Sequence, residues 1–107
     1  MSDAGKTKIL VVDDVEVNRF TLRDIIKDMG YLPILAENGE QALKAVERFP
    51  IQLIITDIAM PEMDGYELCK RIKQNPDTRD IPLIFISAFD SPEDVVKGKN
   101  PSAFKRI

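Results

Sequence analysis

The stretch LIITDIAMPEMDGYEL, residues 53–68, joins an apolar run directly to an acidic residue. Leu53 to Thr56 is too short for a helix, and a short β-branched run of this kind is typical of a buried parallel strand. Asp57 follows at once, whereas the next helical pattern begins near Gly65. Helix capping acts only within the first turn of a helix, so it explains this carboxylate poorly.

Similar apolar runs alternate with helical patterns along the rest of the chain. The predicted strands are residues 8–12, 32–36, 53–56 and 81–86. The predicted helices are residues 15–29, the stretch that Pro50 closes, residues 65–73, and a short helix at 91–98. Alternation of buried strands with amphipathic helices predicts an α/β fold, with a parallel sheet, right-handed crossovers and helices on both faces.

The first helix carries the clearest periodic signal. Its apolar residues recur at spacings of three and four, which predicts that one face of the helix packs inward; they are Leu22, Ile25, Ile26 and Met29. Gly30 follows, where helices commonly end in a left-handed residue. In the second strand, Pro33 indicates either the start of the strand or the edge of the sheet.

Length and composition indicate a single small domain. The chain has 107 residues, of which 44% are hydrophobic and 31% charged, as in ordinary globular proteins. No apolar run is long enough to cross a bilayer. The first eight residues lack the apolar middle of a secretory signal, and the lone Cys69 cannot form an internal disulfide. We therefore expect a cytoplasmic protein without membrane segments.

Charge and residue usage restrict the possible chemistry. The net charge of −3 and the lack of a basic stripe make nucleic acid a poor choice of direct partner. The sequence contains no histidine, which excludes Ser–His and Cys–His nucleophile pairs and nearly all zinc sites. Any reaction at this protein must use carboxylates, hydroxyls or lysines.

Polar residues stand at the ends of three predicted strands: Asp13 and Asp14 after the first, Asp57 after the third, and Ser87 after the fourth. Because parallel strands point the same way, these residues should meet at one edge of the sheet, where ligands of open α/β sheets bind. Crowded carboxylates need a neutralising cation. Oxygen ligands without histidine or cysteine favour Mg²⁺.

These motifs resemble the receiver domains of two-component response regulators. The resemblance covers residues 7–97 and rests on ILVVDD, AENG at 36–39, LIITDIAMPEMDG and IPLIFISA. It implies a flavodoxin-like parallel sheet in the order 2-1-3-4. It also implies a phosphorelay switch rather than a turnover enzyme, with a histidine kinase or phosphotransfer protein as the phosphodonor.

The resemblance assigns a role to each candidate site residue. Asp57 is implied to be the phosphoacceptor. Asp13, Asp14, Asp57 and the backbone carbonyl of Ala59 are implied to bind Mg²⁺. Ser87 takes the place of the family's switch hydroxyl, which turns toward the phosphoryl group. A carboxylate can attack phosphorus to form an acyl phosphate while the metal offsets the developing charge, so these roles are chemically consistent.

The C-terminal part departs from the family pattern. Receiver domains continue into a fifth strand ending in Lys-Pro and then a fifth helix, and neither is legible here. Lys105 has the wrong spacing from Ser87, so the family's lysine role is not assigned to it. We expect one domain over residues 1–107, with a core at 7–97 and an atypical tail at 98–107. The fourth strand would then be an exposed edge, which favours a homodimer.

Four alternatives remain open. The chain could be a receiver-like interaction module that works without phosphorylation, which the missing lysine favours. It could be a truncated or rearranged fragment of a longer regulator that oligomerises. A small metal-dependent phosphatase is a third possibility, although no general acid beyond the same carboxylates is visible. Asp13 and Asp14 could also simply cap the first helix.

Overall fold

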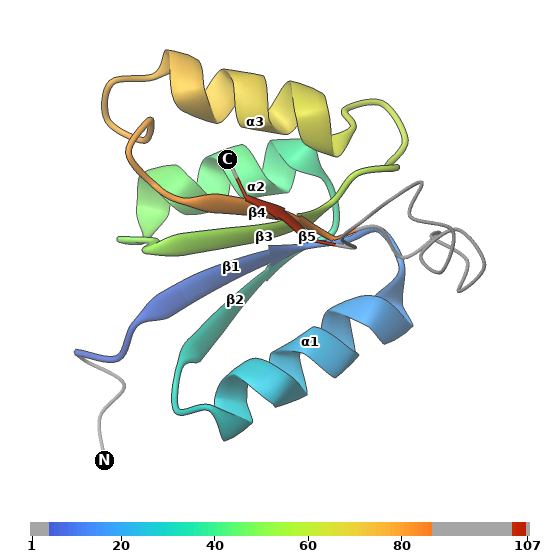
Figure 1. Ribbon diagram of the computed structural model, residues 1–107, viewed down its shortest axis with the longest axis vertical. Helices are drawn as coiled ribbons and strands as arrows, with labels where there is room; N and C mark the ends of the chain where they lie inside the picture. Colours follow the sequence, from blue (N-terminus) through green and yellow to red (C-terminus); the bar gives the residue numbers. More distant parts are fainter. Residues whose placement is uncertain (1–4, 87–103, 107) are drawn as a thin grey trace.

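The computed structural model describes residues 5–86 and the backbone of residues 104–106. Five strands and three helices alternate through most of this range (Figure 1). The elements are β1 (Lys8–Val12), α1 (Glu16–Asp28), β2 (Leu32–Ala36), α2 (Gly39–Arg48), β3 (Leu53–Asp57), α3 (Gly65–Gln74), β4 (Leu83–Ile86) and β5 (Phe104–Arg106). The short helix predicted at residues 91–98 lies outside the described residues.

The strands form one sheet in the order β2-β1-β3-β4-β5. The first four strands are parallel, with Val12 opposite Thr56 in the β1–β3 pair and Asp57 opposite Ile86 in the β3–β4 pair. The predicted α/β class and the order 2-1-3-4 are therefore confirmed. All four parallel strands bring their carboxyl ends to the same edge of the sheet.

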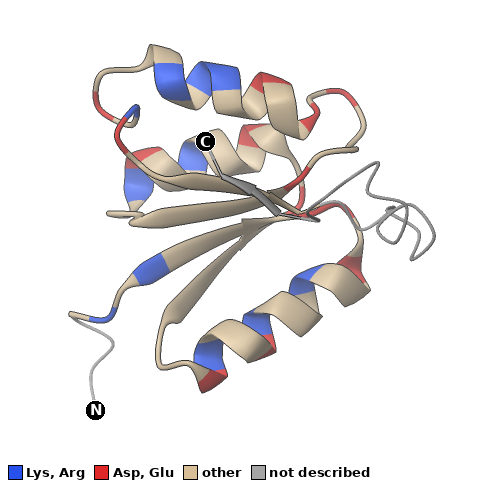
Figure 2. Ribbon diagram, in the orientation of Figure 1, with Lys and Arg blue, Asp and Glu red and all other residues tan. Residues whose placement is uncertain are grey.

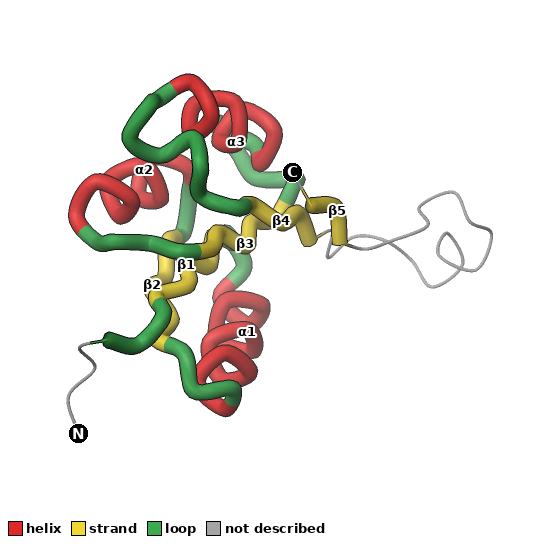
Figure 3. Tube along the Cα trace, turned by 60° about the vertical axis from the view of Figure 1, so that its left-hand side comes forward, coloured by secondary structure: helices red, strands yellow, loops and turns green. Residues whose placement is uncertain are grey.

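Helices cover both faces of the sheet, as the apolar strands require. Helices α2 and α3 lie on one face and α1 lies on the other (Figures 1 and 3). Strand β1 serves both cores by alternation: Leu10 and Val12 belong to the larger cluster, whereas Ile9 and Val11 belong to the cluster that includes Ile26 of α1. This double burial explains why β1 reads as a continuous apolar run.

Local contacts set where the helices begin and end. After α1, Gly30 has a φ of 90°, and its N–H donates to Lys27 O while that of Tyr31 donates to Ile26 O. This pair of bonds is a Schellman motif. The side chain of Asn38 caps α2 by accepting from Gln41 N. Asp64 caps α3 in the same way by accepting from Glu67 N.

The predicted inward face of α1 is only partly correct. Ile26 is buried and Leu22 is half-buried, but Ile25 and Met29 are 49% and 63% exposed. Arg19 lies on the buried face instead and is 7% exposed.

The fifth strand is atypical rather than missing, and the expectation of an unpaired β4 edge is wrong. Strand β5 pairs with β4 in antiparallel orientation, from Ile84 opposite Arg106 to Ile86 opposite Phe104. A three-residue strand is too short to produce a periodic signal in the sequence. Strand β4 is also shorter than predicted, because Ile81 and Pro82 precede it.

The other edge of the sheet is protected by its sequence. The N–H of Leu32 donates inward to Thr7 O, so the next residue, Pro33, would direct its N–H outward if it had one. Proline has no such donor, which makes this edge a poor template for strand pairing. The interpretation of Pro33 as an edge residue is confirmed.

Within residues 5–86 and 104–106, no helix combines the length and the apolar character that crossing a membrane would need.

The beginning of α3 packs directly against the end of β3. The N–H of Gly65 donates to Ile58 O at 2.8 Å. A Cβ atom at Gly65 would overlap the carbonyl oxygen of Asp57 and lie 3.0 Å from Ile58 Cα. Only glycine allows this approach, so Gly65 fixes the loop that follows the strand.

Replacement of Gly65 by alanine should therefore destabilise the fold by about 1–3 kcal/mol, the usual cost of overpacking. The measurement is urea unfolding of Gly65→Ala beside Lys70→Ala, an exposed position on the same helix. Equal stability of the two variants would contradict the tight contact.

Candidate functional site

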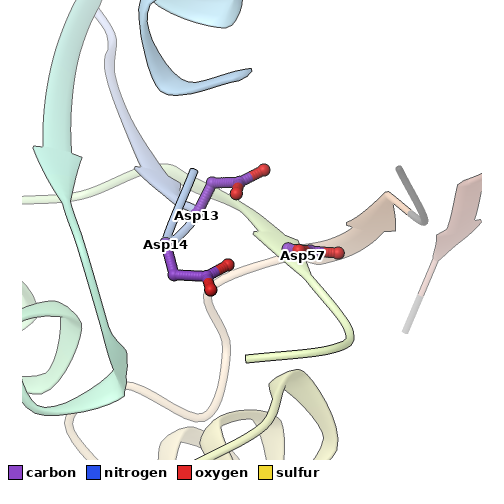
Figure 4. A group of neighbouring side chains, drawn as sticks. All are labelled: Asp13, Asp14 and Asp57. Atoms are coloured by element: carbon purple, nitrogen blue, oxygen red, sulfur yellow. The ribbon is translucent and has the colours of Figure 1, made fainter. Parts of the chain in front are cut away.

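Three carboxylates meet at the carboxyl ends of β1 and β3. Asp13 and Asp14 follow the last residue of β1, and Asp57 is the last residue of β3. Because β1 and β3 are parallel neighbours in register, the three side chains extend from the same edge of the sheet (Figure 4). One carboxylate oxygen from each lies within 4.8 Å of the others. The predicted convergence of these three residues is confirmed.

Backbone contacts fix Asp13, which is 4% exposed. Its N–H donates to Ala36 O of β2 at 3.1 Å, and its Oδ1 accepts from Val15 N at 2.9 Å. Its carbonyl oxygen accepts a hydrogen bond of 2.9 Å from Nη1 of Arg19. Asp13 therefore has little freedom to turn away from the edge.

Capping of α1 does not account for the acid pair. The N-cap of α1 is Val15, whose side chain makes no cap hydrogen bond. The backbone N–H from which the carboxylate of Asp13 accepts is that of the N-cap residue itself, not one in the first helical turn. Asp14 is exposed at the same edge, so both acids remain available for another role.

Asp57 is 2% exposed and only half satisfied. Its Oδ1 accepts from Ile58 N at 2.8 Å. Its Oδ2 is the one buried side-chain oxygen or nitrogen of residues 5–86 that has no hydrogen-bond partner. Because buried polar atoms are almost always paired, this oxygen indicates a place for an outside group. Helix α3 is capped by Asp64, so Asp57 has no capping role.

Burial and mutual repulsion make the charged forms of these carboxylates costly. Burial is the main reason that the pKa of Asp57 is raised above 3.8, and the charge of Asp13 adds to it. The pKa of Asp13 is also raised, mainly by burial and further by the charge of Asp14. Figure 2 shows acidic segments of the ribbon at this edge of the sheet. A cation placed among the carboxylates would relieve the repulsion.

The donor atoms fit a metal ion. Three carboxylates that can each supply one oxygen form a possible metal site, and an oxygen-only set suits a hard divalent cation. The unpaired Oδ2 of Asp57 supports this fit, since a bound cation would give the buried oxygen a partner.

The remaining predicted site residues are placed less completely. Ala59 lies in the loop after β3 and is exposed, and its backbone N–H lowers the pKa of Asp57. Ser87 lies outside the described residues, immediately after Ile86, which is the partner of Asp57 across the β3–β4 pair. Lys105 is described only as backbone in β5.

Sequence reasoning missed Arg19, which contacts the site from α1. The available signal was its position three residues before Leu22 and seven before Ile26, on the same helical stripe. A cation on an apolar stripe indicates a buried charge with a specific partner.

Comparison with known proteins agrees with this geometry. The family model for the response regulator receiver domain matches residues 9–107. A gliding motility regulatory protein of Myxococcus xanthus is 36% identical over 100 residues, which are 94% of this chain and 13% of that protein. A probable chemotaxis protein CheY of Rhizobium etli is 37% identical over 89 residues, covering 82% of this chain and 69% of that protein.

A solved structure shows the same fold. The N-terminal domain of a response regulator receiver protein from Methanoculleus marisnigri JR1 has a TM-score of 0.74 and 39% identity, covering 86% of this chain and 76% of that one. Sequence, fold and the position of the acidic edge thus lead to one conclusion. The chain belongs to the response regulator receiver domain family, whose members accept a phosphoryl group in two-component signalling.

Proposed function

We propose that Asp57 is the phosphoacceptor and that Asp13, Asp14, Asp57 and the carbonyl of Ala59 hold Mg²⁺ beside it. One observation carries the proposal: three carboxylates from two neighbouring strand ends lie within 4.8 Å, and one buried oxygen of Asp57 has no partner. A structural role alone leaves both the crowding and the unpaired oxygen without a compensating interaction.

In the proposed reaction, a carboxylate oxygen of Asp57 forms a bond to phosphorus while the bond between phosphorus and the donor breaks. The leaving group keeps the electron pair of that bond. Mg²⁺, when bound, would offset negative charge on the phosphoryl oxygens. The N–H of Ile58, 2.8 Å from Oδ1 of Asp57, orients the carboxylate, and the backbone around Asp13 holds the acid pair beside it.

Phosphorylation would change the charge at this edge. The acyl phosphate carries about −1.5 to −2 charges in total, in place of the single charge of the carboxylate, and it has several acceptor oxygens. We propose Ser87 as the hydroxyl that responds, because it follows Ile86, the residue paired with Asp57. A local change in charge would thereby reach the segment after β4, where a partner could detect it.

The phosphodonor is proposed to be a histidine kinase or a phosphotransfer protein, and the chain to act as a switch rather than a turnover enzyme. The chain spans only 13% of the Myxococcus relative. The signalling output that phosphorylation of this chain would control is therefore part of the proposal too. One domain over residues 1–107, a cytoplasmic location and the lack of direct nucleic-acid binding stay predictions. Homodimerisation also stays a prediction, but the β4 edge that was expected to mediate it is paired with β5.

A second candidate is a receiver-like module that binds its partner without phosphorylation. The antiparallel direction of β5 favours it. The family resemblance implies a lysine at the carboxyl end of a parallel fifth strand. Residues 5–86 and 104–106 include no lysine in such a position. Partner binding that is unchanged in Asp57→Asn would support this candidate.

Treatment with a small acyl phosphate and Mg²⁺ should add the mass of one phosphoryl group to the protein. The added group should be released by hydroxylamine, as an acyl phosphate is, and should not form when EDTA removes the metal. Intact mass spectrometry measures this for the wild type, for Asp57→Asn and for Asp77→Asn, an exposed acid in the α3–β4 loop.

Only Asp57→Asn should lose the modification. Equal labelling of Asp57→Asn and the wild type would exclude Asp57 as the acceptor, and an unlabelled wild type would favour the second candidate.

The metal-free protein should become more stable at neutral pH when Asp57 is replaced by asparagine. The folded-state pKa of Asp57 is raised above 3.8. The stability of the fold is therefore not reduced by Asp57 at a pH below the pKa of Asp57 in the unfolded chain. It falls as the pH rises through the pKa of Asp57 in the folded protein. The advantage of Asp57→Asn should disappear on acidification, because the wild-type carboxyl then becomes neutral too.

Urea unfolding in EDTA at several pH values measures this difference, with Asp77→Asn as the control. Adding Mg²⁺ at about 100 times its Kd should stabilise the wild type by about 2.7 kcal/mol and Asp57→Asn by less. A variant less stable than the wild type in EDTA at neutral pH would contradict the charge conflict.

A further inference from the structure

The buried Arg19 side chain contacts the acidic site without being one of its proposed ligands. Its guanidinium donates from Nη1 to the carbonyl oxygen of Asp13 at 2.9 Å. Its Nη2 lies 3.6 Å from Oε1 of Glu37, in the segment after β2. The residue is 7% exposed, and a buried charge is costly unless it is hydrogen-bonded.

The bond to Asp13 is the more important of these two contacts. Glu37 has a side chain that is 63% exposed, and ion pairs with one partner in water contribute little. The bond from Arg19 to the carbonyl of Asp13 is short, buried and charge-assisted, which is the stronger class of hydrogen bond. The burial of Arg19 is therefore explained mainly by Asp13.

The oxygen that Arg19 holds has a special place in the chain. It belongs to the peptide group that joins Asp13 to Asp14, so its orientation sets how the two acids are directed relative to each other. The other side of Asp13 is tied to β2 through Ala36 O. Arg19 adds a tie from α1, and the peptide group is thereby fixed between two elements.

We propose that Arg19 is a positioning residue for the cation site: it holds the Asp13–Asp14 peptide so that both acids face the ion together with Asp57. This inference rests on the proposed Mg²⁺ site. Groups that orient metal ligands without touching the metal commonly change metal affinity by about 10- to 100-fold when they are removed.

Charge and geometry make opposite predictions for Arg19. A guanidinium near a bound cation repels it, so if charge alone mattered, removing Arg19 would tighten Mg²⁺ binding. If positioning matters more, removing Arg19 weakens binding although a repulsive charge has gone. The direction of the change in affinity therefore separates the two effects.

The experiment compares Arg19→Met, Arg19→Lys and Arg23→Met with the wild type. Methionine keeps much of the apolar volume but cannot donate, whereas lysine keeps the charge and one donor group without the planar fork. Arg23 is a matched control on the same helix: its guanidinium also lies over Phe20, but it pairs with Asp24 rather than with the site.

Calorimetric titration with Mg²⁺ should show affinity about tenfold weaker or more for Arg19→Met. Arg19→Lys should fall between this variant and the wild type, and Arg23→Met should match the wild type. Circular dichroism establishes that each variant is folded at the titration temperature. Unchanged or tighter binding by folded Arg19→Met would overturn the proposal. If that variant does not fold, wild-type affinity in Arg19→Lys would overturn it.

A second measurement needs no metal. Hydrogen exchange at the amide of Val15, which donates to the Asp13 carboxylate, should be faster in Arg19→Met. Exchange at Leu68, whose N–H donates to Asp64 O in α3, should be unchanged. A wild type that binds no Mg²⁺ would refute the proposed function, and the exchange rates would still decide whether Arg19 positions Asp13. Equal rates at Val15 in variant and wild type would overturn that role.

Discussion

The parallel pairing of β1 with β3 is the constraint on which the site depends. Val12 lies opposite Thr56, so the residues that follow them, Asp13 and Asp57, reach the same edge of the sheet. The fold thus brings like charges together, and burial raises the pKa of both Asp13 and Asp57. A divalent cation bound among the carboxylates would offset this repulsion.

The surrounding structure maintains this unfavourable arrangement through short contacts. Strand β1 is buried on both faces, so it cannot shift to relieve the repulsion. Gly65 lets α3 begin directly against the backbone of Asp57, and Arg19 links α1 to the peptide between Asp13 and Asp14. Elements from both faces of the sheet therefore contact the backbone of the acidic residues at this edge.

Much of this arrangement could be predicted from the sequence because its signals are local. Short apolar runs, helical spacing and Gly30 identify the elements, and parallel topology then brings Asp13, Asp14 and Asp57 together. Strand β5 was missed because three residues carry no period, and its antiparallel pairing depends on contacts distant in sequence. Arg19 was missed because its partner is a backbone oxygen, which no residue pattern encodes. The exposure of Ile25 and Met29 was not predicted, because periodicity gives the direction of a helix face but no measure of what covers that face.

The proposal that these three aspartates share one divalent cation can be tested with crystals soaked in Mn²⁺. Anomalous scattering locates the ion independently of any functional assay. We expect an anomalous peak between the ends of β1 and β3, within coordinating distance of at least two of the carboxylates of Asp13, Asp14 and Asp57. Well-ordered carboxylates with no peak among them, or with the ion bound elsewhere, would contradict it.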